Sequence, residues 1–208
     1  SSTSRGLGDV YKRQINKAPK NFGKSSFGEN KSIQIEFVSA NPTGPLHVGH
    51  GRGAAYGDAI GRILSSSGYR VEREYYINDA GRQIDILTAS VLIRVFQNDF
   101  GDFFPKNAYK GSYITDIGNS FYKKEKPKSL EDISTLIKKL PEDEEKEIDE
   151  LILRIKNQDL DIWNLIKDFS LDEVLASIKE DLELFNVSFD HWFFESVSYT
   201  HLTLPTKA

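Results

Sequence analysis

The chain contains 208 residues, of which 38% are hydrophobic and 28% charged, a balance that suits one globular domain or one domain with an insertion. No apolar stretch approaches the roughly 20 residues of a membrane span, and no secretion signal opens the chain, so we expect a cytoplasmic protein with no membrane association. The absence of cysteine excludes disulfides and thiolate chemistry, and a net charge of −4 gives no overall electrostatic reason to bind nucleic acid.

The two ends of the chain differ in pattern from the sequence between them. Residues 1–14 and 196–208 resemble translated sequencing-adapter sequence, so we expect them to be non-native and to lie outside the fold; ordinary flexible termini are the alternative. The lack of any methionine, including at Ser1, favours a fragment. Residues 15–32 are rich in Lys, Asn, Gly and Ser without apolar periodicity, which predicts a mobile linker.

A first strand is predicted over 33–39. Ile33, Ile35 and Phe37 alternate there with polar residues, the pattern of a half-buried strand. The two prolines and the glycine of 41–45 exclude a helix and favour a tight loop directly after the strand.

The next residues predict a strand–helix–strand unit. Residues 48–67 have helical periodicity and small residues that allow close packing on a sheet, and a second strand follows over 69–77. This order implies a right-handed parallel crossover. Ligands bind such sheets beyond the carboxyl ends of the strands, which places 39–50 at the site and 78–83 beside it. A further helix over 80–97 should cover one face of the sheet.

The second half of the chain predicts few further strands. We expect 33–98 to form the first half of an α/β domain, and 99–195 to be a largely helical insertion together with the continuation of that domain. Helical periodicity is found over 148–169 and 171–185. The acidic run 142–147 is typical of a solvated helix face.

The densest signal for chemistry is LHVGHGRG, which contains His47 and His50. Three residues apart, these histidines would share one side of a first helical turn, where backbone N–H groups and the helix dipole favour an anion. Gly49 and Gly51 leave room for a nucleotide, and the rigid loop 42–45 can fix its entry angle. Two imidazoles donating hydrogen bonds to an α-phosphate would stabilise an adenylyl-transfer transition state.

Three alternatives compete with phosphate binding by this segment. A histidine in a loop is usually a surface or packing residue. Zinc would need a third protein ligand, and the remaining histidines, His191 and His201, lie far away in sequence without ligand spacing. The glycines of 51–57 could form a dinucleotide-binding loop with a glutamate of the second strand holding a ribose, but they begin well after the first strand ends rather than in the strand-to-helix turn.

A family resemblance is carried by residues 35–84, IEFVSANPTGPLHVGHGRGAAYGDAIGRILSSSGYRVEREYYINDAGRQI, which closely resemble bacterial arginyl-tRNA synthetases. HVGH stands in the place of the HIGH element of class I synthetases. NFGKSSFGENK, YKGSYITDIG and DLELFNVSFDHWFFES extend the resemblance over 21–196. It implies an α/β fold, namely the N-terminal half of a class I synthetase Rossmann-like parallel-sheet catalytic domain with a largely helical insertion.

The resemblance also implies an activity. The parent enzyme would activate L-arginine with ATP and Mg²⁺, the ATP serving as substrate without a resident metal, and attach the arginine to tRNA(Arg). Most tRNA contacts would come from domains outside this chain, and the parent would be monomeric. We find no KMSKS-like lysine loop and no anticodon-binding region in the sequence, so we expect this chain alone to be inactive in charging. The alternatives are an HxGH nucleotidylyltransferase and a catalytically inert nucleotide-binding or interaction module.

Individual roles follow from the same resemblance. His47 and His50 would be the catalytic residues. The ATP-binding residues would be Pro42, Thr43, Gly44, His47, Gly49, His50 and Gly51. The arginine-binding residues would be Glu36, Ser39, Asn41, Asp79 and Gln83.

Some residues near these positions have simpler possible roles or depart from the family. Glu36 on physical grounds alone would be a solvated strand residue, and Asp79 would cap the following helix. Arg82 stands where the family pattern NDAGNQI has Asn, which leaves its role open. Tyr109 and Tyr113 lie in a segment similar to GYxGxYIxDIA, and their rings could equally be packing anchors.

Overall fold

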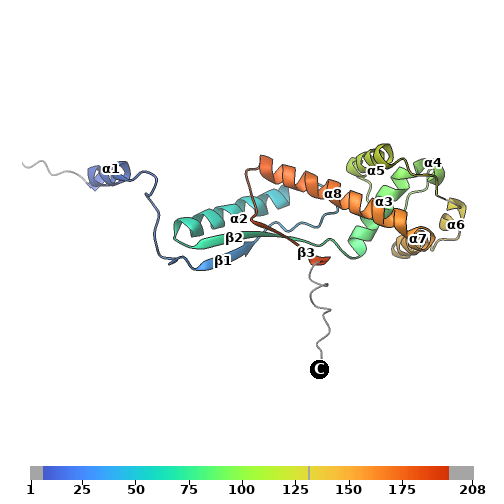
Figure 1. The fold of residues 1–208 in the computed structure, drawn as a ribbon, viewed down its shortest axis with the longest axis horizontal. Coiled ribbons are helices and arrows are strands. Elements are labelled where there is room, and N and C mark those ends of the chain that lie inside the picture. The colour runs from blue at the N-terminus through green and yellow to red at the C-terminus, as the bar shows by residue number, and fades with distance from the viewer. Residues whose placement is uncertain (1–6, 131, 197–208) are drawn as a thin grey trace, which may run out of the picture.

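The computed structural model describes residues 7–130 and 132–196 (Figure 1). Within these residues three strands, β1 (Ser32–Glu36), β2 (Arg70–Ile77) and β3 (His191–Phe194), form a parallel sheet in the order β1–β2–β3. The helices are α1 (Leu7–Lys17), α2 (Val48–Ser66), α3 (Arg82–Val95), α4 (Gln97–Phe100), α5 (Ser112–Glu125), α6 (Ile133–Ile137), α7 (Glu144–Gln158) and α8 (Leu160–Leu184). The predicted α/β class, a parallel sheet with a largely helical insertion, is confirmed.

The β1–α2–β2 crossover forms where the sequence predicts it. The bounds of α2 and β2 agree with the expected helix and second strand to within one residue. Small residues bring α2 onto the sheet: a Cβ at Gly57 would lie 2.2 Å from Cγ of Phe37, so only glycine permits this approach. Strand β1 ends three residues earlier than expected because Val38 and Ser39 adopt left-handed backbone conformations, with φ values of 66° and 41°.

The third strand is not predicted by the sequence. Its four residues fall in the stretch expected to be largely helical, whereas the structure pairs them in parallel with β2, from Glu74 opposite His191 to Ile77 opposite Phe194. Asp190 fixes the start of this pairing, because its backbone N–H donates to the carbonyl of Arg73 (2.9 Å) and its carboxylate accepts from the N–H of Arg73 (2.8 Å). A short strand paired with residues more than a hundred positions away leaves no periodic signal.

The beginning of the chain also differs from expectation. Residues 7–17 form α1, which Figure 1 shows apart from the body of the molecule and which includes the first three residues of the expected linker 15–32. The later part of that linker is held in place, since the backbone N–H groups of Ser25, Gly28 and Asn30 donate to carbonyls of Ser66, Ser67 and Gly68 at 2.8–2.9 Å. Part of the expected linker is thus hydrogen-bonded to the end of α2 and to the turn that follows it. The terminal segments 1–6 and 197–208 lie outside the described residues. Ser196, the first residue of the expected non-native tail, is described and is hydrogen-bonded to Asp79, so it differs from that expectation.

Two helix boundaries in the insertion are corrected. Periodicity predicts helices over 148–169 and 171–185, but the break lies at Asp159, whose carboxylate accepts from the N–H of Ile162 (2.9 Å) and caps α8. Ser170 does not interrupt α8, because its hydroxyl donates to the carbonyl of Ile166 within the helix (2.6 Å). The acidic run 142–147 does open a helix, α7, and its first residues are exposed as expected.

The hydrophobic core lies mainly within the helical part. Helix α3 is central, with ten buried residues, and packs against α5 and α8. Trp163, Phe121 and Ile148 are fully buried around it. Among the described helices, none is both long enough and apolar enough to cross a membrane.

Candidate functional site

The loop between β1 and α2 is fixed to the neighbouring strand before it reaches the histidines. The buried hydroxyl of Tyr75 accepts from the N–H of Ala40 and donates to its carbonyl, both at 3.1 Å. Burial raises the pKa of Tyr75 to about 12, so the group stays a neutral donor and acceptor. The hydroxyl of Ser39 accepts from the N–H of Tyr76 (3.1 Å). The carboxyl end of β1 and the following loop therefore hold one position relative to β2.

His47 and His50 cap the N-terminus of α2 reciprocally. Nδ1 of His47 accepts from the N–H of Gly49 (3.1 Å), and Nδ1 of His50 accepts from the N–H of His47 (3.2 Å). The two rings stack with their centroids 3.7 Å apart. A Cβ at Gly49 would come within 2.9 Å of the His47 ring, so glycine is required for this arrangement. The spacing seen in the sequence is therefore the spacing of a capping box built from two imidazoles.

The capping bonds decide which ring nitrogens carry protons. Because a backbone N–H is always a donor, both Nδ1 atoms must accept, and the neutral rings then carry their protons on Nε2. Burial, and secondarily the charge of His47, lower the pKa of His50 below its ordinary value, which favours the neutral form. The pair thus presents two Nε2–H donors beside the positive end of a helix, an arrangement suited to an anionic oxygen.

A cavity of about 390 Å³ lies in front of the histidines. It is lined by residues from the β1–α2 loop, from the start of α3 and from the segment that leads into α5: Asn41, Thr43, Gly44, Pro45, His47, His50, Gln83, Tyr109 and Tyr113. This volume is in the range of small-molecule sites. Its position beyond the carboxyl ends of β1 and β2 is the one expected for a ligand of a parallel sheet.

Side-chain and backbone hydrogen bonds join the walls of this cavity. The amide of Asn41 donates to Oε1 of Gln83 at 2.6 Å, which links the β1–α2 loop to α3. The hydroxyl of Tyr113 donates to the carbonyl of Thr43 at 2.8 Å. Burial raises the pKa of Tyr109 and of Tyr113, so both hydroxyls remain protonated. The proton of Tyr113 is used in its bond to Thr43, so its hydroxyl can only accept from a ligand.

Several of the residues predicted from the sequence do not line the cavity. The side chain of Ser39 anchors the loop to β2, and Pro42, within the loop, is buried. Glu36 is exposed at the end of β1, opposite Glu74, on the sheet face away from Phe37. Gly49 and Gly51, also outside the lining, lie in the first turn of α2, where Gly49 makes room for the His47 ring.

Asp79 has a different partner from either of those expected. Its carboxylate accepts from the N–H (2.9 Å) and the hydroxyl (2.5 Å) of Ser196, and Asn78 donates to the carboxylate of Glu195 (2.7 Å). The N-cap of α3 is instead Gly81, without a side-chain cap. The prediction that Asp79 caps this helix is therefore wrong, because Ser196, two residues after β3, takes up its hydrogen-bonding capacity.

Three residues that line the cavity are not among the site residues predicted from the sequence: Pro45, Tyr109 and Tyr113. The two tyrosines lie about 60 to 70 positions after the loop they face. The available signal is the segment YKGSYITDIG, whose family resemblance fits a packing role and a site role equally well.

Arg82 connects the edge of this cavity to the insertion. Its guanidinium donates from Nε to Asp149 (2.8 Å) and also binds Glu145 at the start of α7. Asn107 donates to the same Glu145 (3.0 Å), two residues before Tyr109. The acidic first turns of α7 therefore bind Arg82, which precedes Gln83, and Asn107, which lies two residues before Tyr109.

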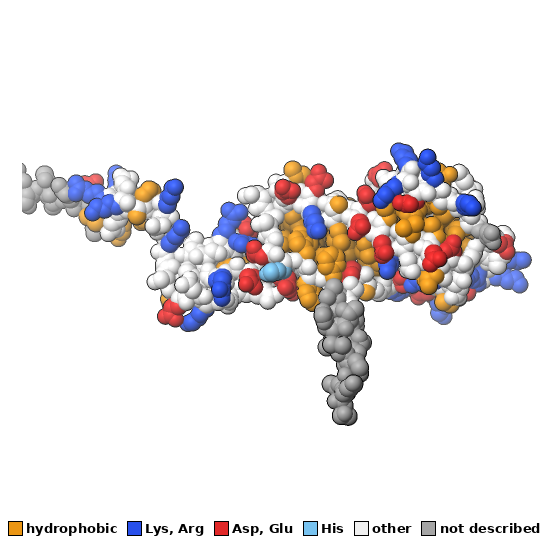
Figure 2. Space-filling view, in the orientation of Figure 1, with side chains coloured by type: hydrophobic (Ala, Val, Ile, Leu, Met, Phe, Trp, Pro, Cys, Tyr) orange, Lys and Arg blue, Asp and Glu red, His pale blue; other side chains and the backbone are white. Residues whose placement is uncertain are grey.

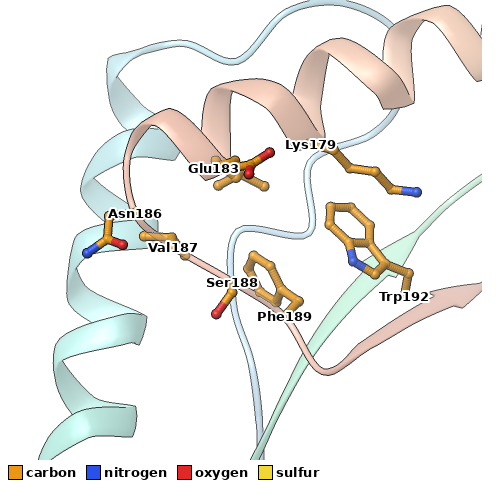
Figure 3. A pocket seen from close by; sticks show the side chains of 8 residues that line it. Lys179, Glu183, Asn186, Val187, Ser188, Phe189 and Trp192 are labelled. Carbon is orange, nitrogen blue, oxygen red and sulfur yellow. The ribbon is translucent and has the colours of Figure 1, made fainter.

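A second cavity, of about 340 Å³, lies between the end of α8 and β3 (Figure 3). Phe189 and Trp192 form its aromatic wall, and Nζ of Lys179 lies 4.9 Å from the centroid of the Trp192 ring. None of the predicted site residues borders it. Among residues 7–130 and 132–196, no group of three or more His, Cys, Asp or Glu side chains is placed to hold a metal ion. The histidine-lined cavity is therefore the candidate site.

Comparison with known proteins agrees with this geometry. The sequence model of the family described as tRNA synthetases class I (R), catalytic domain, matches residues 14–199. The arginine–tRNA ligase of Hydrogenovibrio crunogenus is 45% identical over 196 residues, which cover 87% of this chain and 33% of that protein. That of Coxiella burnetii strain RSA 493 is 43% identical, over 88% of this chain and 32% of its own length. The solved structure of a putative arginyl-tRNA synthetase from Campylobacter jejuni superposes with a TM-score of 0.68 at 29% identity, covering 96% of this chain and 38% of that one.

The parallel sheet and the histidine pair that caps its crossover helix are those of a class I aminoacyl-tRNA synthetase catalytic domain. More narrowly, the chain belongs to the family of arginyl-tRNA synthetase catalytic domains. It spans about a third of the length of the curated relatives that it matches.

Proposed function

We propose that this protein activates L-arginine with ATP and transfers the arginine to tRNA(Arg), with the histidine-lined cavity binding ATP and arginine. In the first step a carboxylate oxygen of arginine attacks the α-phosphorus, pyrophosphate leaves, and arginyl-adenylate forms. In the second step a hydroxyl of the terminal adenosine attacks the arginyl carbonyl and AMP leaves. In the relatives about two thirds of the length lies outside the matched part, so the proposal assigns ATP and arginine binding to this chain and charging to a protein of the relatives' full length.

The observation that carries this proposal is the reciprocal cap of His47 and His50. It commits both Nδ1 atoms and leaves two Nε2–H donors for the α-phosphate, where negative charge develops during adenylyl transfer. Pro42, Thr43, Gly44, Gly49 and Gly51 would shape the loop and helix turn around the nucleotide. Magnesium would enter with ATP, as the counter-ion of its phosphates.

For the amino acid, we propose that Asn41 and Gln83 contact arginine directly, because both line the cavity and their amides face each other. Glu36, Ser39 and Asp79 would act from the adjoining strand ends, Ser39 by holding the loop and Asp79 by holding the end of β3. A carboxylate such as Glu36 suits a cationic substrate group. We further propose a monomeric parent acting in the cytoplasm, where tRNA is charged.

Isothermal titration of the chain with Mg-ATP tests the proposal. His47→Ala with His50→Ala should weaken ATP binding by roughly tenfold or more, as expected when hydrogen bonds to a charged group are lost. His191→Ala, which removes a histidine outside the cavity, should leave the affinity unchanged. Equal ATP affinity in all three proteins would contradict the proposal and favour an inert module. Binding of phosphopantetheine or nicotinamide mononucleotide, without binding of arginine, would instead favour a nucleotidylyltransferase.

A further inference from the structure

Lysine side chains gather at the end of α5 that lies away from the cavity. Residues 123–128, KKEKPK, contain four lysines and one glutamate in a chain whose net charge is −4. Lys124 lies 4.0 Å from the carboxylate of Glu125, whereas Lys123, Lys126 and Lys128 are exposed and form no ion pair with the residues that the structure describes. In Figure 2, Lys and Arg side chains are grouped at the end of the molecule where Figure 1 places α4, α5 and α6.

A polar cavity of about 240 Å³ is lined in part by Tyr122, the residue that directly precedes Lys123. Its walls are Arg94, Val95, Gln97, Asn98, Asn119 and Tyr122, and they include no carboxylate. The Nε–H of Arg94 is buried without a hydrogen-bond partner among the described residues, while its guanidinium lies 4.3 Å over the ring of Phe104. Unpaired buried donors are uncommon in native proteins, and an arginine beside three amide side chains offers the donors that a phosphate group needs.

Helix α5 connects this basic end to the candidate site. Tyr113, in its first turn, lines the histidine-lined cavity, and Tyr122, near its end, lines the polar cavity. At about 1.5 Å per residue, Tyr113 and Lys123 are separated by roughly 15 Å along the helix axis. A nucleic-acid strand rising roughly 3.4 Å per nucleotide would cover this distance in four or five nucleotides. A polynucleotide whose terminal nucleotide lies in the cavity can therefore place a phosphate near these lysines only a few nucleotides from that end.

We propose that Lys123, Lys126 and Lys128, together with Arg94, form a binding surface for the phosphate backbone of tRNA close to its aminoacylated end. We call these four residues the α5 basic patch. The proposal rests on the proposed function, which brings the terminal adenosine to the cavity. It also explains how an acidic chain binds a polyanion, since the patch concentrates unpaired positive charge on one surface.

Fluorescence anisotropy with a labelled RNA hairpin that mimics the acceptor stem of tRNA(Arg), including its single-stranded 3′ end, tests the patch. Lys123→Gln, Lys126→Gln and Lys128→Gln combined should weaken binding by about tenfold or more at low salt. The slope of log affinity against log salt concentration should fall in magnitude by about two, since each lost phosphate contact contributes roughly 0.7 to 0.9. The matched control combines Lys17→Gln, Lys20→Gln and Lys24→Gln, which removes three exposed lysines at and after the end of α1, far along the chain from α5.

Two outcomes would overturn the proposal: no measurable binding of the hairpin by the unmodified chain, or equal loss in the patch variant and the control. Thermal unfolding of both variants checks that each is folded. Titration with Mg-ATP separates this proposal from the proposed function. If the lysine variant binds ATP normally but binds RNA more weakly, the result supports the patch. If replacing His47 and His50 leaves ATP affinity unchanged, the result contradicts the proposed function, and the patch is then judged by the RNA measurement alone.

Discussion

The side-chain amide of Asn41 donates a hydrogen bond to the carboxamide oxygen of Gln83 at 2.6 Å. The two residues follow the carboxyl ends of β1 and β2, respectively, and are separated by 42 positions in the sequence. Each amide uses one group in this contact, so the oxygen of Asn41 and the NH₂ of Gln83 remain for a ligand. In the cavity, this pair therefore connects the loop that follows β1 to the helix that follows β2.

Gln83→Ala should weaken the binding of L-arginine by roughly tenfold while leaving ATP affinity nearly unchanged. The substitution removes a proposed ligand contact and also leaves the Asn41 amide without its partner. Isothermal titration with each substrate measures the two effects separately. Gln34→Ala, which truncates an exposed glutamine on β1, is the control. Equal arginine affinity in both variants would remove Gln83 from the proposed arginine site.

The cap formed by His50 should make stability depend on pH. The folded-state pKa of His50 lies below the ordinary value of 6.5, so near that pH the folded chain binds fewer protons than the unfolded chain. Its contribution to stability is therefore present above about pH 6.5 and is lost as the pH falls toward the lowered pKa. Glutamine at this third helical position can still accept from the cap N–H but does not titrate.

Thermal unfolding of the chain and of His50→Gln between pH 7.5 and 5.5 measures this effect. The unfolding midpoint of the chain should fall further than that of the variant across this range. His191→Gln should retain the full pH dependence. Parallel curves for the chain and His50→Gln would show that protonation of His50 does not act on the α2 cap.

Arg82→Asn should remove the ion pairs that connect α7 of the insertion to the edge of the cavity. It replaces the guanidinium that binds Asp149 and Glu145 by the residue that the family pattern has at this position. Exposed ion pairs are individually weak, so we expect arginine affinity to fall by only about two- to fivefold, with a smaller loss at high salt. Arg82→Lys should restore part of the affinity.

The control for Arg82 is Arg62→Asn, which removes an exposed ion pair with Asp58 on α2. This pair lies outside the cavity lining, so its loss should leave arginine affinity unchanged. Titration of both variants with L-arginine at low and high salt provides the measurement. If Arg62→Asn and Arg82→Asn lowered arginine affinity equally, the ion pairs of Arg82 with α7 would have no specific effect on the site at Gln83.

Two glycines of α2 should respond in opposite directions to alanine. A Cβ at Gly57 would overlap the ring of Phe37, whereas a Cβ at Gly53 would have no neighbour within 4 Å. Gly57→Ala should therefore destabilise the fold by about 1–3 kcal/mol through overpacking. Gly53→Ala should stabilise it by about 0.5–1 kcal/mol, because alanine is the better helix former. Urea unfolding of the two variants measures both changes, and destabilisation of similar size would show that α2 does not pack on Phe37 as described.

Much of the crossover could be predicted from local patterns. Ile33, Ile35 and Phe37 alternate with polar residues, and α2 is rich in small residues; both patterns reflect burial against near neighbours. They therefore predict the first two strands and the crossover helix to within a few residues. The pair His47 and His50 was found for the same reason, because a capping box is a local structure. The predicted end of β1 differs from the observed one because Val38, a β-branched residue, adopts a left-handed conformation that sequence propensity disfavours.

The resemblance over residues 21–196 is enough to identify the family. The first two strands, the helix between them and the histidine cap can be read from local patterns, since each depends on residues a few positions apart. Three features become visible in the folded structure alone: β3 joins the sheet, Asp79 binds Ser196, and Tyr109 and Tyr113 complete the cavity. Those contacts join residues up to 117 positions apart. Their formation depends on how the helical insertion packs around α3, and that packing is governed by the shape and volume of many side chains together, which no short sequence pattern records.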